Sequence, residues 1–426
     1  ALPSKTVLVT NADNDVAGFT LSKATASTSE AGTTDNFIVV LDHQPLTNVL
    51  LNVASADPAE GTVSVGTLTF TPSDWNNATA HQVTVTGMDD NIVDGNITYN
   101  VTIGVAAGSD AKFLGVAGQI VSVTNADNDV AGFTLSKTIA STSEAGTTDN
   151  FTVVLTHQPL TNVVLNVANA DPTEGTVSVI ALTFTPSDWN TATTHKVTIT
   201  GVDDDIIDGS IIYNVTVSVA AGSDAKFLGV ASQTVSVTNA DNDVAGFTLS
   251  KTSLSTSEIG TTDNFTVVLK AKPNSNVVLN VVSGDLTEGT VSPATLTFTP
   301  ENWEIAQPIV VTGVNDSEAD GSITYNVTVS IDDINSDDNF DAVANKNVAV
   351  TNADNDVAGI TVSTISNHTT EAGLTATFTI VLNTLPTDDV DIHLSSSNTL
   401  EGTISANNLK FTTINWNVPQ TITVTG

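Results

Sequence analysis

The amino-acid sequence predicts an all-β protein built from tandem antiparallel β-sandwich domains in an extended array. The octapeptide NADNDVAG begins at residues 11, 125, 239 and 352, so it recurs at intervals of 114, 114 and 113 residues. A period of this length exceeds that of solenoid repeats, and each repeat is therefore expected to be a domain. Between the copies, short runs alternate apolar and polar residues, and no stretch shows a helical period with caps.

Seven strands are expected in the first repeat, separated by segments rich in Gly, Pro, Asn and Asp. Val, Thr, Ile and Phe are frequent in these runs and suit the pleated, half-buried surface of a sheet. The runs are GFTLS from residue 18, NFIVVL from 36, NVLLNV from 48, TLTFT from 67, HQVTVTG from 81, YNVTIGV from 99 and QIVSVT from 119. Seven short strands in about 100 residues favour an immunoglobulin-like sandwich, with strands A to G in chain order.

The repeats divide the chain into five expected segments. SKTVLVT near the start matches the last strand of the later repeats, and the fourth repeat stops after TITVTG. The chain is therefore expected to be an excerpt of a longer array. The expected segments are 1–15 (the last strand of a preceding repeat plus a linker), 16–129, 130–243 and 244–356 (three complete sandwiches) and 357–426 (an incomplete fourth).

The composition narrows the range of partners. Eleven Lys and Arg residues stand against 47 Asp and Glu residues, a formal charge of -36. Such a chain repels nucleic acid and anionic membranes and attracts cations. The absence of Cys excludes disulfides and Cys-based zinc sites. No apolar run approaches the roughly 18 residues that a membrane-spanning helix requires, so no membrane insertion is expected in this segment.

The acidic residues of the first repeat follow the parity of the strands. Strands of a sandwich alternate in direction, so loops A–B, C–D and E–F and the exit from strand G lie at one end. The acids expected at that end are Glu30, Asp35, Asp57, Glu60, Asp89, Asp90, Asp94, Asp127 and Asp129. Carboxylates a few ångströms apart repel by about 1 kcal/mol per pair in water, so this end is expected to hold a cation. Hard oxygen ligands from several loops suit Ca²⁺ better than Mg²⁺.

Taken together, these residues resemble the Calx-β domain, a calcium-binding sandwich. The resemblance lies in the early Glu30, the GTLTFTP run before Trp75, and VTGMDD followed by DG and a Tyr-containing strand. It covers every repeat and implies Ca²⁺ held by the early Glu, an acid in the C–D loop, an Asp pair with a following acid in the E–F loop, and two Asp residues at the end of the domain. The implied ligands are Glu30, Asp57, Asp89, Asp90, Asp94, Asp127 and Asp129; Glu144, Asp171, Asp203, Asp204, Asp208, Asp241 and Asp243; and Glu258, Asp285, Asp316, Asp320, Asp354 and Asp356.

The later repeats depart from this pattern. In the third repeat Asn315 replaces the first Asp of the pair, so weaker binding or fewer ions are expected. In the fourth, Glu371 is kept but Asn398 stands in place of the C–D acid, and the sequence ends before an E–F loop. The NADNDVAG copy at residue 11 has no domain before it in this chain, so an incomplete site is expected there.

Other recurring residues have less specific interpretations. A Trp follows each predicted D strand and either closes the end of the core or stacks on a sugar. The DPxEG motif is expected to form a tight turn that leaves its Glu on the surface. His43 and His157 have no evident carboxylate partner, and no set of residues indicates catalysis. The Trp residues are Trp75, Trp189, Trp303 and Trp416, and the Glu residues of the DPxEG motif and its counterparts are Glu60, Glu174, Glu288 and Glu401.

The function expected from the sequence is structural. The leading hypothesis is an extracellular repeat region of a cell-surface, adhesin-like protein, a Ca²⁺-stiffened spacer rod whose partners are neighbouring domains of the same chain. Two alternatives stay open. One is a filament, sheath or surface layer that assembles from other copies of the chain, and the other is a carbohydrate-binding module that uses the Trp residues. No enzymatic activity is expected.

Overall fold

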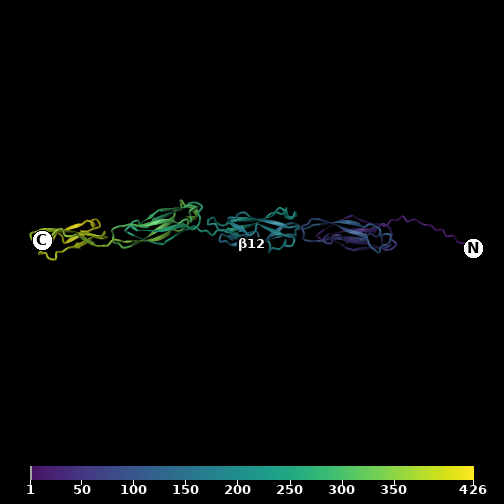
Figure 1. Cartoon of the computed structure of the whole chain (residues 1–426), viewed down its shortest axis with the longest axis horizontal. Coiled ribbons are helices and arrows are strands. Elements are labelled where there is room, and N and C mark those ends of the chain that lie inside the picture. Colours follow the sequence, from purple (N-terminus) through teal and green to yellow (C-terminus); the bar gives the residue numbers. More distant parts are fainter. Residues whose placement is uncertain (1) are drawn as a thin grey trace. The chain divides into compact units, whose positions relative to one another are not determined.

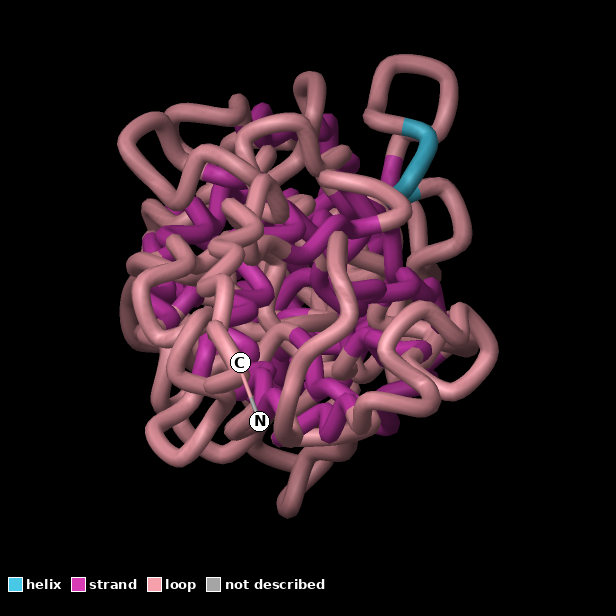
Figure 2. Tube along the Cα trace, turned by 90° about the vertical axis from the view of Figure 1, so that its right-hand side faces the viewer, coloured by secondary structure: helices cyan, strands magenta, loops and turns pink. Residues whose placement is uncertain are grey.

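Strands make up nearly all the regular structure of residues 2–426, which the computed structural model describes (Figures 1 and 2). One turn of 3-10 helix, Asp338–Phe340, is the only helical segment among them. Ala1, part of the expected segment 1–15, lies outside the described residues. The strands of the first repeat are β1 (Phe19–Leu21), β2 (Thr25–Ser29), β3 (Thr34–Leu41), β4 (Val49–Ser55), β5 (Gly61–Val63), β6 (Thr67–Phe70), β7 (Gln82–Gly87), β8 (Ile97–Val105) and β9 (Gln119–Ala126).

The nine strands of the first repeat form two sheets around one core. One sheet has the order β1-β3-β7-β5 and the other β2-β9-β8-β4-β6. Alternate residues of both sheets are buried in a single apolar cluster, which includes Phe37 and Val83 from the first sheet and Val53 and Val121 from the second. This is the antiparallel, immunoglobulin-like sandwich predicted from the alternation of apolar and polar residues.

Two strands, β2 and β5, were not predicted. The predicted A strand is divided: β1 pairs antiparallel with β3, whereas β2 pairs parallel with β9. The D strand is divided in the same way, since β5 pairs with β7 and β6 with β4. The sequence of β2, TASTS, has no large apolar residue and is a strand because β9 offers it a backbone partner. Each divided strand keeps its direction as it changes sheets, so the predicted parity of the loops is preserved.

The second and third repeats reproduce this order of strands. Their sheets use strands from one expected segment each. The second repeat has β10 (Phe133–Leu135), β11 (Ile139–Ser143), β12 (Thr148–Leu155), β13 (Val163–Asn169), β14 (Gly175–Val177), β15 (Ala181–Phe184), β16 (Lys196–Gly201), β17 (Ile211–Val219) and β18 (Gln233–Ala240). The third has β19 (Phe247–Leu249), β20 (Ser253–Ser257), β21 (Thr262–Leu269), β22 (Val277–Ser283), β23 (Gly289–Ser292), β24 (Thr295–Phe298), β25 (Gln307–Gly313), β26 (Ile323–Ile331) and β27 (Lys346–Ala353).

The fourth repeat contains one complete sheet and part of another. The complete sheet has the order β28-β29-β33-β31, and β30 pairs only with β32. The sequence has no counterparts of β8 and β9 here, so the second sheet lacks its central strands and the buried cluster is small. The strands are β28 (Ile360–Val362), β29 (Thr375–Leu382), β30 (Val390–His393), β31 (Thr403–Ile404), β32 (Asn408–Phe411) and β33 (Gln420–Thr425).

The expected strand at SKTVLVT is absent: residues 2–15 form no strand in the structure. Its counterpart β9 is a strand because β8 and β2 donate and accept backbone hydrogen bonds on either side of it. Residues 4–10 have neither neighbour in this chain, and Val7, Leu8 and Val9 are largely exposed. An alternating sequence without a partner strand does not form a sheet.

The chain divides into two compact units. The first comprises the residues up to Asp203 together with Ser210–Ala240, and the second comprises Asp204–Gly209 together with Asp241–Gly426. Residues 204–209 lie within the expected segment 130–243, yet they group with the third repeat. In the described residues, no helix is both long and apolar enough to cross a bilayer.

Candidate metal centre

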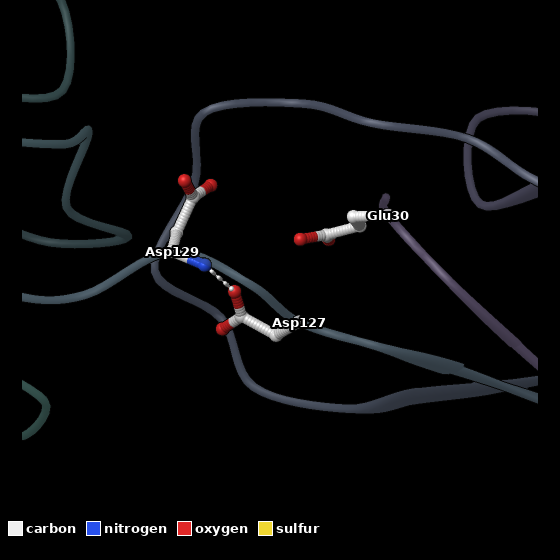
Figure 3. A group of neighbouring side chains, drawn as sticks. All are labelled: Glu30, Asp127 and Asp129. Carbon is white, nitrogen blue, oxygen red and sulfur yellow. Dashed lines mark hydrogen bonds between the residues drawn. The ribbon is translucent and has the colours of Figure 1, made fainter. Parts of the chain in front are cut away.

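Three carboxylates meet at the end of the first repeat, and we call them the Glu30 triad (Figure 3). Glu30 follows β2, and its backbone N–H donates to the Ala126 carbonyl (3.0 Å), which ties the A–B loop to the end of β9. Asp127 and Asp129 follow β9, and the Asp129 N–H donates to Asp127 Oδ1 (2.7 Å). Carboxylate oxygens of all three residues lie within 4.8 Å of one another. Strand parity therefore brings together acids about 100 residues apart in the sequence.

Burial makes the charge on Glu30 costly. Its side chain is 3% exposed, and burial raises its pKa to about 7. Repulsion from Asp127, Asp90 and Asp129 also raises this pKa, whereas a hydrogen bond from the Asn128 N–H to Glu30 Oε2 (2.9 Å) opposes it. A bound cation would stabilise the charged form of Glu30 near neutral pH, because it would offset both the repulsion from the Asp residues and the cost of burying the charge.

Asp129 joins the triad to the second repeat. Its side chain is 4% exposed, and its Oδ1 lies 3.2 Å from His157 Nε2. Burial raises the pKa of Asp129, and His157 opposes the rise. The other carboxylate oxygen, Oδ2, is buried with no hydrogen-bond partner. His157 thus has the carboxylate partner that the sequence did not reveal, and His43 likewise lies 3.3 Å from an oxygen of Asp15.

A second group of carboxylates, the Glu60 triad, lies beside the first. Oxygens of Glu60, Asp90 and Asp94 also lie within 4.8 Å of one another. Glu60 is 8% exposed, which corrects the expectation that it is a surface acid. Burial raises the pKa of Asp94, and the charges on Glu60 and Asp90 add to the rise. Asp94 Oδ1 is buried without a hydrogen-bond partner.

Asn125, the first residue of NADNDVAG, connects the loops around both triads. It is 1% exposed. Its Nδ2 donates to Glu60 Oε2 (3.2 Å) and to the Met88 carbonyl (3.0 Å), and its Oδ1 accepts from Thr28 Oγ1 (3.1 Å). Asn239 and Asn352 make the same contacts in the next two repeats. The recurrence of this Asn was visible in the sequence, but an uncharged residue among acids gave no sign of a structural role.

Several predicted residues lie outside the triads of the first repeat. Asp57 accepts from the Ala59 N–H (3.2 Å) and so closes its own turn. Asp35 lies within β3, where the Lys23 ammonium pairs with it and lowers its pKa. Asp35 thus lies at the expected end of the sandwich, beside the last residues of β7, but it pairs with Lys23 and belongs to neither triad. Asp89 accepts from Asn128 Nδ2 (3.0 Å) at the edge of the Glu30 triad.

The later repeats place their predicted acids in the same way. In the second repeat, carboxylate oxygens of Glu144 and Asp203 lie within 4.8 Å of each other, and so do those of Asp204 and Asp208. In the third repeat, oxygens of Glu258, Asp316 and Asp356 lie within the same distance of one another. Asp241 accepts from the Asp243 N–H (2.6 Å), and Asp354 from the Asp356 N–H (2.6 Å). Asp320 repels the buried Glu288, whose pKa is raised mainly by burial. Asp171 and Asp285 accept from Thr173 and Thr287 in their own turns, as Asp57 does with Ala59.

These donors fit Ca²⁺. The groups supply carboxylate oxygens only, from several loops, with neither sulfur nor a ring of imidazoles. Two of the buried oxygens, Asp94 Oδ1 and Asp129 Oδ2, lack any hydrogen-bond donor. Hard, adaptable oxygen ligation of this kind is what Ca²⁺ prefers. Glu30, Asp127 and Asp129 would hold one ion, and Glu60, Asp90 and Asp94 another.

The fold and the site define a class: tandem β-sandwich repeats that carry clusters of carboxylates at one end. No family model and no curated protein sequence matches the chain. Solved structures with a similar fold include the calcium binding domain CBD12 of CALX1.1, at 15% identity and a TM-score of 0.20, with 47% of this chain and 79% of that one covered. Mouse cadherin-23 EC22-24 matches at 10% identity and a TM-score of 0.30, covering 81% and 100%. The human desmocollin-1 ectodomain matches at 9% identity and a TM-score of 0.28, and the match covers 97% of this chain and 74% of that one. Likenesses this distant carry no weight for function.

Proposed function

We propose that the chain is an extracellular structural region of a cell-surface protein, a calcium-dependent spacer that acts through its joints rather than through catalysis. The Glu30 triad is the observation that carries the proposal. Two of its three acids, Asp127 and Asp129, belong to the segment that leads into the second repeat, and Asp129 also contacts His157 of that repeat. An ion held by the triad would restrain this segment, so metal binding would reduce motion at the joint.

Electrostatics supports a role for the metal in stability as well as orientation. Glu30, Asp94 and Asp129 all have raised pKa values, chiefly from burial, and like charges add to each rise. Without a cation, the end of the repeat must either protonate these groups or tolerate their repulsion. Carboxylate sites in extracellular modules bind Ca²⁺ at about 10⁻⁴–10⁻³ M, which suits a region that is loaded outside the cell.

Isothermal titration calorimetry and small-angle scattering test the proposal directly. Calcium is expected to bind with a dissociation constant of about 10⁻⁴–10⁻³ M. The chain should become more flexible, by scattering, when EDTA removes the metal. The proposal is wrong if calcium produces no heat of binding or if EDTA leaves the flexibility unchanged. Assembly of the chain into a filament would appear in the same scattering data as a mass well above that of one chain.

The Trp and His residues favour structural roles. Trp75 and its counterparts are partly buried and pack against the apolar cores, which supports a role in closing the end of each core. The His81 ring stacks on Phe70 at 3.8 Å, and its nitrogens lie 3.2 and 3.1 Å from the carbonyls of Asn77 and Thr69. These contacts engage His81 within the repeat and support a non-catalytic interpretation.

A further inference from the structure

A short segment of the E–F loop, between β7 and β8, reaches from the first repeat onto the second. We call Asn91–Val93 the tongue. The Val93 N–H donates to the Gln158 carbonyl (3.0 Å), and the Gln158 N–H donates to the Asn91 carbonyl (2.7 Å). Ile92 and Gln158 form a parallel β-bridge. Two backbone hydrogen bonds therefore join the repeats without any acidic side chain.

Val93 inserts into the core of the second repeat. It is 5% exposed, and it belongs to the buried cluster that contains Phe133 and Phe227. Val93, Lys226 and Val230 also line a cavity of about 390 Å³ at this joint. A side chain of the first repeat thus completes the apolar core of its neighbour, and removing it would expose that core.

The tongue is held at both ends by the candidate metal residues. The Ile92 N–H donates to Asp90 Oδ1 (2.7 Å), and the Gly95 N–H donates to Asp127 Oδ2 (2.6 Å). Gly95 has a φ of 78°, a backbone conformation that favours glycine and turns the chain back toward β8. The backbone groups that dock the tongue on Gln158 are therefore different from the Ile92 and Gly95 N–H groups that donate to the acids.

The same contact recurs in the second unit, where residues 204–209 dock on the third repeat. The Lys272 N–H donates to the Asp205 carbonyl (2.7 Å), and Ile206 forms a parallel bridge with Lys272. Ile207, the counterpart of Val93, packs against the third core, and Asn339 Nδ2 donates to its carbonyl (3.1 Å). This docking explains why residues 204–209 group with the second unit.

The third tongue keeps the backbone contact but carries Glu318 and the small Ala319 where the first has Ile92 and Val93. The Leu385 N–H donates to the Ser317 carbonyl (2.8 Å), and Glu318 bridges Leu385. Ala319 stands where the earlier tongues have Val93 and Ile207. A cavity of about 470 Å³ lies at this joint and is lined by Ala319, Leu385 and further residues of the fourth repeat.

The receiving surface is already formed on the first repeat. Gln44, Lys112 and Phe113, the counterparts of Gln158, Lys226 and Phe227, line a cavity of about 440 Å³. A surface of this shape fits an extended backbone that carries a branched apolar side chain.

We propose that this surface, which begins each repeat, is a docking site for the tongue of the repeat before it, and that it holds the tongue most firmly when Val or Ile stands at the position of Val93. The docked tongue holds the joint by itself, in addition to any metal. The inference goes beyond the proposed function, because the hydrogen bonds and the buried Val93 need no ion.

Hydrogen exchange in the full chain tests the proposal at one amide, that of Gln158, which is protected only while the tongue is docked. V93A is expected to speed exchange of this amide by about tenfold, the change that truncating a buried Val produces in a local opening equilibrium. V53A is the matched control, because Val53 is buried to 3% exposure within the core of the first repeat. It should leave the Gln158 amide unchanged.

The reciprocal variant A319V should slow exchange of the Leu385 amide by filling the cavity at the third joint. An unchanged Gln158 amide in V93A would overturn the proposal, and so would faster exchange in A319V. Repeating the measurement in EDTA separates the two ideas. Protection of Gln158 that persists in EDTA supports an independent tongue, and complete loss contradicts it. A calorimetric titration without heat would instead contradict only the metal.

Discussion

The joint between the first and second repeats and the joint between the third and fourth use the same parts with different side chains. At the first joint, Asp89 accepts a hydrogen bond from Asn128, and Val93 fills a neighbouring core. At the third, Asn315 accepts the equivalent bond from Asn355 (2.7 Å), and Ala319 lines a cavity. The backbone geometry is kept, while Asn315 replaces the acid Asp89 and Ala319 replaces the larger Val93; Glu318 stands where the first joint has Ile92.

This difference shows that the joint has two separable components. Charge determines how strongly a cation is held, because each additional carboxylate strengthens a site of hard oxygen ligands. Apolar volume determines how firmly the tongue seats, because an unfilled cavity forfeits contacts. The third joint is weaker in both respects, so the joints of one chain are expected to differ in stiffness.

Removing the metal should have the largest effect. EDTA is expected to cost the first repeat about 3 kcal/mol of stability per site, the value for calcium at about 100 times its dissociation constant. The third repeat should lose less, because Asn315 replaces an acid. Scanning calorimetry with and without calcium measures both transitions. Equal losses of stability in the two repeats would show that Asn315 does not weaken the third site.

The pH dependence of the metal-free chain should be nearly as large. The folded pKa of Glu30 is raised from 4.5 to about 7, so the folded state binds a proton that the unfolded chain releases. Its contribution is fully present below pH 4.5 and is lost as the pH rises to about 7, a decrease of up to about 3 kcal/mol.

Urea unfolding in EDTA at several pH values measures this slope. The E30Q variant is the control and should show a smaller decrease, because its side chain does not titrate. Burial also raises the pKa of Glu258 at the third joint, so E258Q should likewise reduce the loss of stability as the pH rises. A slope that E30Q leaves unchanged would rule out Glu30 as its source.

Exchanging one residue between the joints should change calcium affinity by about tenfold, equivalent to about 1.4 kcal/mol. D89N should weaken the first joint, and N315D should strengthen the third, because the hydrogen bond to the following Asn is kept and only the charge changes. Calorimetric titration of each variant measures the shift. The charge-based account would be refuted by shifts in the same direction for both variants.

The smallest effect is expected from the Glu of the DPxEG turn. E60Q should stabilise the metal-free first repeat by about 1 kcal/mol, because it removes one repulsive contact within the Glu60 triad. E401Q in the fourth repeat should change nothing, because Glu401 is exposed. Thermal denaturation of both variants in EDTA checks the pair, and a destabilised E60Q would show that the triad is not repulsive.

Most of the candidate site followed from strand parity. Glu30, Asp90, Asp94, Asp127 and Asp129 meet because the loops that carry them lie at one end of the sandwich. The parity of the loops does not depend on the division of strands A and D between the sheets. The predicted position of the acids is therefore correct even though β2 and β5 were not predicted. Parity placed Asp35 at this end but could not show that it pairs with Lys23, because a side chain within a strand points by its register.

The repeat, the all-β class, the alternation that builds each core and the end of the sandwich at which the acids gather can all be read from the sequence. All of these depend on periodicity and spacing, which are local properties of the chain. Tertiary structure alone decided that Glu60 is buried, that Asn125 connects three loops and that Val93 belongs to the core of another domain. Those roles depend on which surfaces meet after folding, and a side chain in a loop carries no local mark of the partner that will cover it.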